Sequence, residues 1–262
     1  MKKYFFLSFV LAACSNSENN NTGNTLTEPD KPATEVEKKA SSSGACNQLI
    51  FFQPGAEVEA KSYNASGEEV SSQHTKILDV KNEDGMAVAY VEGSDLQSGS
   101  DKPKVVNYSY KCDGNKIYFD VASMFRDAEK QKDATFESSL IEYPIDVKEG
   151  ESLPDATGVM KAEKNGKKME MKYHFINRKV EAKEDVTTPA GTWNCYKISH
   201  DTKVEMDIPG MNEQAKKMME AMQGGMKTTT ITWMAPDFGI VKMEMYMNGK
   251  LASRNEVVSF KK

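Results

Sequence analysis

Residues 168–176 read KMEMKYHFI, an alternating run that predicts the fold class. Met169, Met171, Tyr173 and Phe175 fall on one face of an extended chain, while charged residues and a histidine fall on the other. A period of two predicts a β-strand with one buried and one solvated face. Strands of this kind are typical of an antiparallel sheet that covers a core on one side.

Turn-forming dipeptides separate further alternating runs on both sides of this segment. Asp-Gly and Asn-Gly supply the positive φ angles that two-residue hairpins require. These and similar pairs stand at Ser66-Gly67, Asp84-Gly85, Asp113-Gly114, Asn165-Gly166, Ala190-Gly191 and Asn248-Gly249. The runs between them predict strands at 56–64, 69–80, 86–92, 104–112, 116–120, 157–163, 168–186, 192–206, 227–235, 239–247 and 250–260.

Two segments depart from the alternation. Val121–Lys132 and Gly210–Gln223 space their apolar residues at the helical period, and Gly224-Gly225 would end the second helix. The predicted strands are too many for a small flat sheet, so we expect the sheet to curl. The predicted fold is mainly β: a large antiparallel curled sheet, a meander forming a barrel or half-barrel, with two short helical insertions.

The N-terminus has the pattern of a lipoprotein signal peptide. Lys2 and Lys3 precede an apolar run at 4–11 that is too short to span a hydrocarbon core of about 30 Å. Residues 11–14 read LAAC, the bacterial lipobox pattern, which predicts a signal peptide at 1–13 and lipid attachment at Cys14. The alternative is an ordinary signal peptide that ends in Ala-Ala-Cys by chance. Ser15 follows Cys14 and favours the outer over the inner membrane.

The remaining chain divides by composition into a tether and one domain. Residues 14–45 hold the lipidated Cys and a polar stretch with almost no large apolar side chains, which predicts a disordered tether. As a flexible coil it would reach roughly 30 Å from the membrane. Residues 46–262 are expected to form a single β-rich domain.

The charge distribution argues against a nucleic-acid partner. The chain of 262 residues has a formal net charge of -5, and its 34 Lys and Arg residues are spread along the sequence. Phosphate binding needs a concentrated positive surface, which this distribution does not predict.

Several motifs resemble a known family. They are 177–184 (NRKVEAKE) with 186–198 (VTTPAGTWNCYKI), Cys46 before Pro54-Gly55 and Glu57, the hairpin Cys112-Asp113-Gly114, and Trp233 before Gly239-Ile240-Val241. Together they resemble the TapB-like family of exported proteins from Bacteroidetes, over nearly all of 46–262. The resemblance implies a β-rich fold similar to the half-barrel of periplasmic lipoprotein carriers. It brings no established reaction and no catalytic residues.

Three cysteines follow Cys14, and export implies an oxidising compartment. One disulfide with one free thiol is the simplest interpretation, and three pairings are open. We favour Cys46 with Cys112, which would attach the start of the domain to a hairpin and leave Cys195 free within an apolar strand. Cys-x-x-Cys and His-x-x-x-His spacings are absent, so no metal site and no cofactor are predicted.

Methionine is unusually abundant, with 16 residues. We consider three interpretations: core packing in place of Leu, an adaptable cavity for hydrophobic ligands, and Cu(I) binding through thioethers. Alternation and helical spacing place several of these side chains on shared faces. The candidate ligand-binding residues are Met169, Met171, Tyr173, Met218, Met222, Met243, Met245 and Met247.

The preferred hypothesis from these patterns is a non-enzymatic lipoprotein, tethered to the membrane, that holds a lipid or acyl chain in its curled sheet. A structural or interaction module of an outer-membrane complex, with an envelope protein as partner, is the alternative. An enzyme is not expected, because no nucleophile, base and orienting group stand at a recognisable spacing. His74, His174 and His200 are expected on solvated strand faces.

Overall fold

A computed structural model describes residues 43–120, 134–138, 140–164, 167–207, 212–214, 217–218 and 227–262. Two short helical turns come first, α1 (Ser43–Cys46) and η1 (Ile50–Phe52). The strands are β1 (Glu57–Asn64), β2 (Glu69–Glu83), β3 (Met86–Gln97), β4 (Lys104–Cys112), β5 (Lys116–Asp120), β6 (Ala134–Ser138), β7 (Leu140–Pro144), β8 (Ala156–Lys164), β9 (Lys167–Thr188), β10 (Gly191–Asp207), β11 (Thr228–Ala235), β12 (Gly239–Met247) and β13 (Lys250–Lys261).

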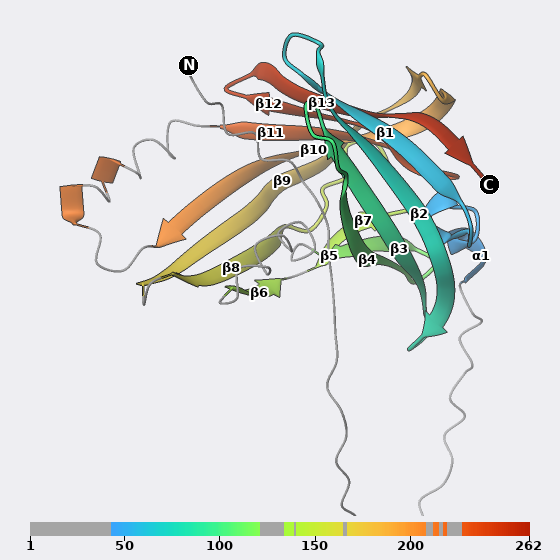
Figure 1. Ribbon diagram of the computed structural model, residues 1–262. Coiled ribbons are helices and arrows are strands. Elements are labelled where there is room, and N and C mark those ends of the chain that lie inside the picture. The colour runs from blue at the N-terminus through green and yellow to red at the C-terminus, as the bar shows by residue number, and fades with distance from the viewer. Residues whose placement is uncertain are drawn as a thin grey trace, which may run out of the picture.

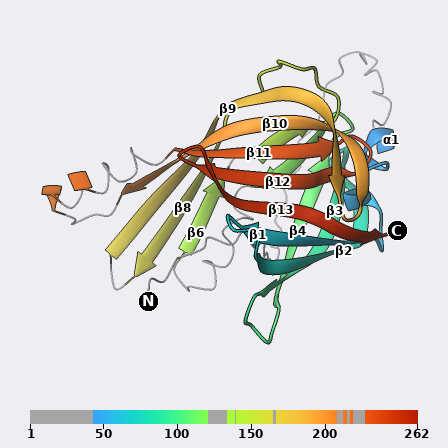
Figure 2. The ribbon, with the colours of Figure 1, turned by 90° about the horizontal axis from the view of Figure 1, so that it is seen from above.

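All of these strands join one 13-stranded sheet in the order β6-β8-β9-β10-β11-β12-β13-β1-β2-β3-β4-β5-β7. Every pairing is antiparallel. The sheet curls strongly, with β8 and β9 on one limb and β2 to β4 on the other (Figure 1). Seen from above, β9 to β13 follow one another around the curve (Figure 2). The prediction of a curled, mainly β fold is confirmed.

The predicted strands all occur, and two more join them. β6 and β7 lie between the strands predicted at 116–120 and 157–163, where no turn dipeptide separates two alternating runs. They also depart from a simple meander, because β6 pairs with β8 and β7 pairs with β5. Pairing with strands other than sequence neighbours leaves no local signal in a sequence.

Several predictions fall outside the described residues. These are the signal peptide, Cys14, the tether up to residue 42, and the helix at Val121–Lys132. For the helix predicted at Gly210–Gln223, the structure describes 212–214 and 217–218, of which 213–214 and 217–218 have helical backbone.

Aromatic side chains fill one end of the curled sheet. Phe51 of η1 packs edge-on against Tyr110 and Phe238, with ring centroids 5.4 Å and 6.2 Å away. Phe238 also lies 5.0 Å from Trp193. Gly239 allows this packing, because a Cβ atom there would lie 2.8 Å from the Phe51 ring. We call this region the aromatic end of the sheet.

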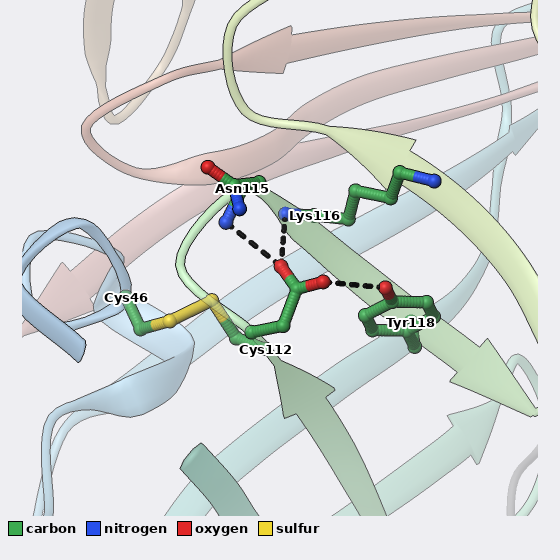
Figure 3. The surroundings of a disulfide bond; sticks show 6 residues. Cys46, Cys112, Asn115, Lys116 and Tyr118 are labelled. Atoms are coloured by element: carbon green, nitrogen blue, oxygen red, sulfur yellow. Dashed lines mark hydrogen bonds between the residues drawn. A yellow bond between two sulfur atoms is a disulfide. The ribbon is translucent and has the colours of Figure 1, made fainter. Parts of the chain in front are cut away.

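A disulfide fastens α1 to the end of β4. The structure pairs Cys46 with Cys112, at a sequence separation of 66 (Figure 3). Cys195 is a buried free thiol. The following turn is fixed by Asp113, whose Oδ1 accepts hydrogen bonds from the backbone N–H groups of Asn115 and Lys116, each at 2.8 Å. The pairing is the one favoured from the sequence.

The link from β7 to β8 runs along β9 and is hydrogen-bonded to it. Gly150 N donates to Val180 O at 2.8 Å, Val180 N donates to Glu151 O at 2.9 Å, and Leu153 N donates to Arg178 O at 2.9 Å. Since β7 pairs with β5 and β9 with β10, this segment connects the two ends of the strand order. We call it the seam.

Candidate functional site

The methionines of β12 lie on the interior face of the sheet. Met243 stands opposite Thr232, and Met245 stands opposite Thr230. Directly opposed residues of an antiparallel pair share a face, and both threonines are buried. Met243 and Met245 are themselves only half-buried, and Met247 is 37% exposed. Apolar side chains therefore remain partly uncovered on the concave side.

Met171 and Met206 lie on the same face, away from the aromatic end. Met171 of β9 stands opposite Met206 of β10 and Met160 of β8. Met171 and its neighbour Val204 pack against the core, and Met206 is half-buried. No alternation of methionines marks Met206 or Met160 in the sequence, because each is the one methionine of its strand. Cross-strand register would have been the necessary signal.

The other sequence-predicted residues have different positions. Tyr173 is buried beside Met171, while Met218 is 68% exposed. The backbone of Met169 pairs with Ala162 at the far end of β9, and Met222 lies outside the described residues. Of the candidates, Met171, Tyr173, Met243, Met245 and Met247 share the concave face. We call Met171, Met206, Met243, Met245 and Met247 the methionine strip.

Polar side chains border the strip beyond β12. Asn255 of β13 stands opposite Met243 and donates through Nδ2 to Ser62 Oγ at 3.0 Å and to Gln73 Oε1 at 3.3 Å. Gln73 stands opposite Asp95, which is buried and accepts a hydrogen bond from Gln97. The concave face is thus amphipathic, with the methionine strip on one side and amide, hydroxyl and carboxylate groups on the other.

A buried polar cluster lies where the strip meets the seam, and we call Tyr143, Arg178, His200 and Thr232 the Arg178 cluster. Arg178 is 2% exposed and donates to Pro154 O and Glu142 O, each at 2.5 Å. Its guanidinium carbon lies 5.1 Å from the centre of the Tyr143 ring. Burial raises the pKa of Tyr143, against smaller lowering effects of Arg178 and Thr232.

His200 corrects the sequence-based expectation of three solvated histidines. Its ring is buried and packs edge-on against Phe175, with centroids 5.5 Å apart. Burial, and then the nearby Arg178 charge, lower the pKa of His200 to about 4. His74 and His174 remain half-buried beside Glu57 and Glu205, at 3.5 Å and 3.6 Å. Register decides the difference, because His200 is opposite the buried Thr230.

The described residues contain few groups suited to covalent or metal chemistry. Burial, followed by nearby acidic side chains, raises the pKa of the Cys195 thiol to about 12, which keeps it protonated and weakly nucleophilic. Within the described ranges, no three His, Cys, Asp or Glu side chains gather closely enough to hold a metal ion. Nor does any helix there have the length and apolar character to cross a membrane.

These features define the class of protein: its fold is a single curled antiparallel sheet whose concave face is amphipathic. A family model described as DUF3108-like matches residues 53–257, so the chain belongs to the DUF3108-like family. This bears out the resemblance to a family of exported proteins that the sequence motifs indicated. No curated protein matches the chain.

Two solved structures share the fold. A protein of Bacteroides fragilis, assigned as exported and with a YmcC-like fold, has 20% identity and a TM-score of 0.59, covering 82% of this chain and 100% of that one. A protein of Parabacteroides distasonis, assigned as a lipoprotein, has 18% identity and a TM-score of 0.57, covering 81% of this chain and 99% of the other. At these identities the likeness concerns the fold.

Proposed function

We propose that this protein is a non-enzymatic, lipid-anchored protein of the bacterial cell envelope that binds a hydrophobic ligand, such as a lipid or acyl chain. The observation that supports the proposal is the methionine strip: apolar side chains turned toward the concave side and left half-buried there. Thioethers are flexible and polarizable, so they adapt to apolar ligands of varied shape.

The proposed location in the cell envelope is supported by separate observations. The lipobox at 11–14 predicts acylation of Cys14, and the two structural neighbours are assigned as an exported protein and a lipoprotein. Ser15 after the lipidated position favours the outer membrane. A domain held at the membrane by a tether has access to lipids that leave or enter the bilayer.

The test is binding of N-phenyl-1-naphthylamine, a neutral probe that fluoresces in apolar surroundings, to the full chain purified without detergent. Met243→Lys places a charge on the strip and is expected to weaken probe binding at least about tenfold, because a buried cation without a partner is costly. Val105→Lys is the matched control, since Val105 is 49% exposed on β4 and its neighbour Val106 is the buried residue. Equal loss in both variants, or no binding by the unaltered chain, would contradict the proposal.

A further inference from the structure

The Arg178 cluster contains polar atoms that the fold leaves unsatisfied. Arg178 Nε, His200 Nδ1 and Thr232 Oγ1 are buried and lack a hydrogen-bond partner of good geometry. Buried polar groups are nearly always hydrogen-bonded, and leaving one unpaired costs about 1–3 kcal/mol. Three such atoms in one cluster are available to form hydrogen bonds with a ligand group.

The cluster also carries an uncompensated positive charge. Among the ion pairs of the described residues, none includes Arg178, which donates to two backbone carbonyl groups and interacts with the neutral Tyr143 hydroxyl. His200 adds no charge at neutral pH, because its pKa is lowered to about 4. One buried guanidinium charge calls for one negative charge, since buried ions are normally paired.

The position of the cluster connects it to the methionine strip. Thr232 stands directly opposite Met243, and His200 stands opposite Thr230, which in turn is opposite Met245. These pairs lie on β10, β11 and β12, which run side by side around the curve (Figure 2). A group bound to the cluster would therefore lie at the end of the apolar strip toward the seam.

We propose that the Arg178 cluster receives the carboxylate of a fatty acid whose chain lies along the methionine strip. The inference rests on the proposed function and names its ligand class. A carboxylate supplies one negative charge and two oxygens, which suit the buried Arg178 Nε, His200 Nδ1 and Thr232 Oγ1 beside the neutral Tyr143 hydroxyl. Hydrogen bonds between a charged group and its partner are about twice as strong as neutral ones.

The experiment compares dodecanoic acid with 1-dodecanol as competitors for N-phenyl-1-naphthylamine on the full chain at pH 8. The two ligands share a chain and differ in the charge of the end group. We expect the acid to displace the probe at a concentration at least about tenfold lower than the alcohol does, because a charge-assisted hydrogen bond is lost with the alcohol.

Substitutions in the Arg178 cluster test whether this cluster causes the preference for the acid over the alcohol. Thr232→Val removes a hydroxyl without changing the shape of a fully buried side chain, and should reduce the acid preference several-fold while leaving the alcohol unaffected. Thr228→Val is the matched control, four residues earlier on the same face of β11, and should keep the preference. Arg178→Gln should abolish the preference, with circular dichroism as the check of folding.

The outcomes separate the two proposals. If the unaltered chain binds acid and alcohol equally, or if Thr232→Val and Thr228→Val behave alike, the carboxylate site is wrong while hydrophobic binding stands. If neither compound displaces a bound probe, or no probe binds, the proposed function itself fails.

Discussion

His200 illustrates how one side chain acquires its properties from neighbours far along the chain. Phe175 and Arg178 come from β9 and Thr230 from β11, and only their pairing with β10 surrounds the imidazole. Alternation from Ile198 would place position 200 inward, yet a histidine in a strand of mixed polarity is more often solvated. The prediction of a solvated side chain, made from the identity of residue 200 as histidine, is therefore wrong.

At this scale we predict a pH-dependent loss of stability. The folded-state pKa of His200 is lowered to about 4 from a usual 6.5, so the unfolded chain takes up a proton below pH 6.5 and the folded chain does not. The unfolding free energy therefore does not depend on His200 titration above pH 6.5. It falls by up to about 3 kcal/mol as the pH decreases from 6.5 toward 4, because protonation then favours the unfolded chain. Urea unfolding at pH 7 and at pH 4.5 measures it.

Two variants isolate the contribution of this histidine from that of the acidic side chains. His200→Gln should lose clearly less stability than the unaltered chain between the two pH values. His74→Gln, which replaces a half-buried histidine beside Glu57, should follow the unaltered chain. If both variants lose as much as the unaltered protein, the buried imidazole does not control this part of the pH profile.

At the scale of elements, the disulfide attaches α1 and η1 to the hairpin formed by β4 and β5. η1 and the residue before it supply Phe51 to the aromatic end and the almost fully buried Ile50 and Leu49 to the core. Such short turns have little stability of their own. The bond between Cys46 and Cys112 keeps them in place over the end of the sheet (Figure 3).

We predict that removing this bond costs about 4 kcal/mol of unfolding free energy, from the chain entropy of a closed loop with a separation of 66 residues. The double variant Cys46→Ser and Cys112→Ser tests it by urea unfolding. Dithiothreitol should destabilise the unaltered chain by a similar amount and leave the double variant unchanged. A reductant with no effect on the unaltered chain would argue against the bond.

At the scale of the whole molecule, Arg178 holds the seam. It extends from β9, near the middle of one limb, to the carbonyl of Glu142 in β7, the edge strand at the other end of the sheet. Its second bond, to Pro154, fixes the link between β7 and β8. The curl of the sheet therefore depends on contacts between strands that are distant in the strand order.

We predict that Arg178→Gln lowers the unfolding free energy by at least about 2 kcal/mol, because a buried guanidinium loses its charge-assisted hydrogen bonds to the backbone carbonyls of Glu142 and Pro154. Lys61→Gln is the control: its ion pair with Glu69, at 2.7 Å, is exposed and should contribute little to the unfolding free energy. Denaturant unfolding compares the two. Equal effects would show that the seam does not depend on Arg178.

The sequence by itself determined the β class, the predicted strands, the turns between them and the family, because alternation and turn chemistry are local properties of the chain. It also singled out the methionines of β9 and β12, whose spacing shows on a single strand. Three features depend on the tertiary structure alone. They are the pairing of β6 with β8 and of β7 with β5, the place of Met206 beside Met171, and the Arg178 cluster. These depend on register between distant strands and on desolvation at the seam, and neither leaves a periodic pattern in the sequence.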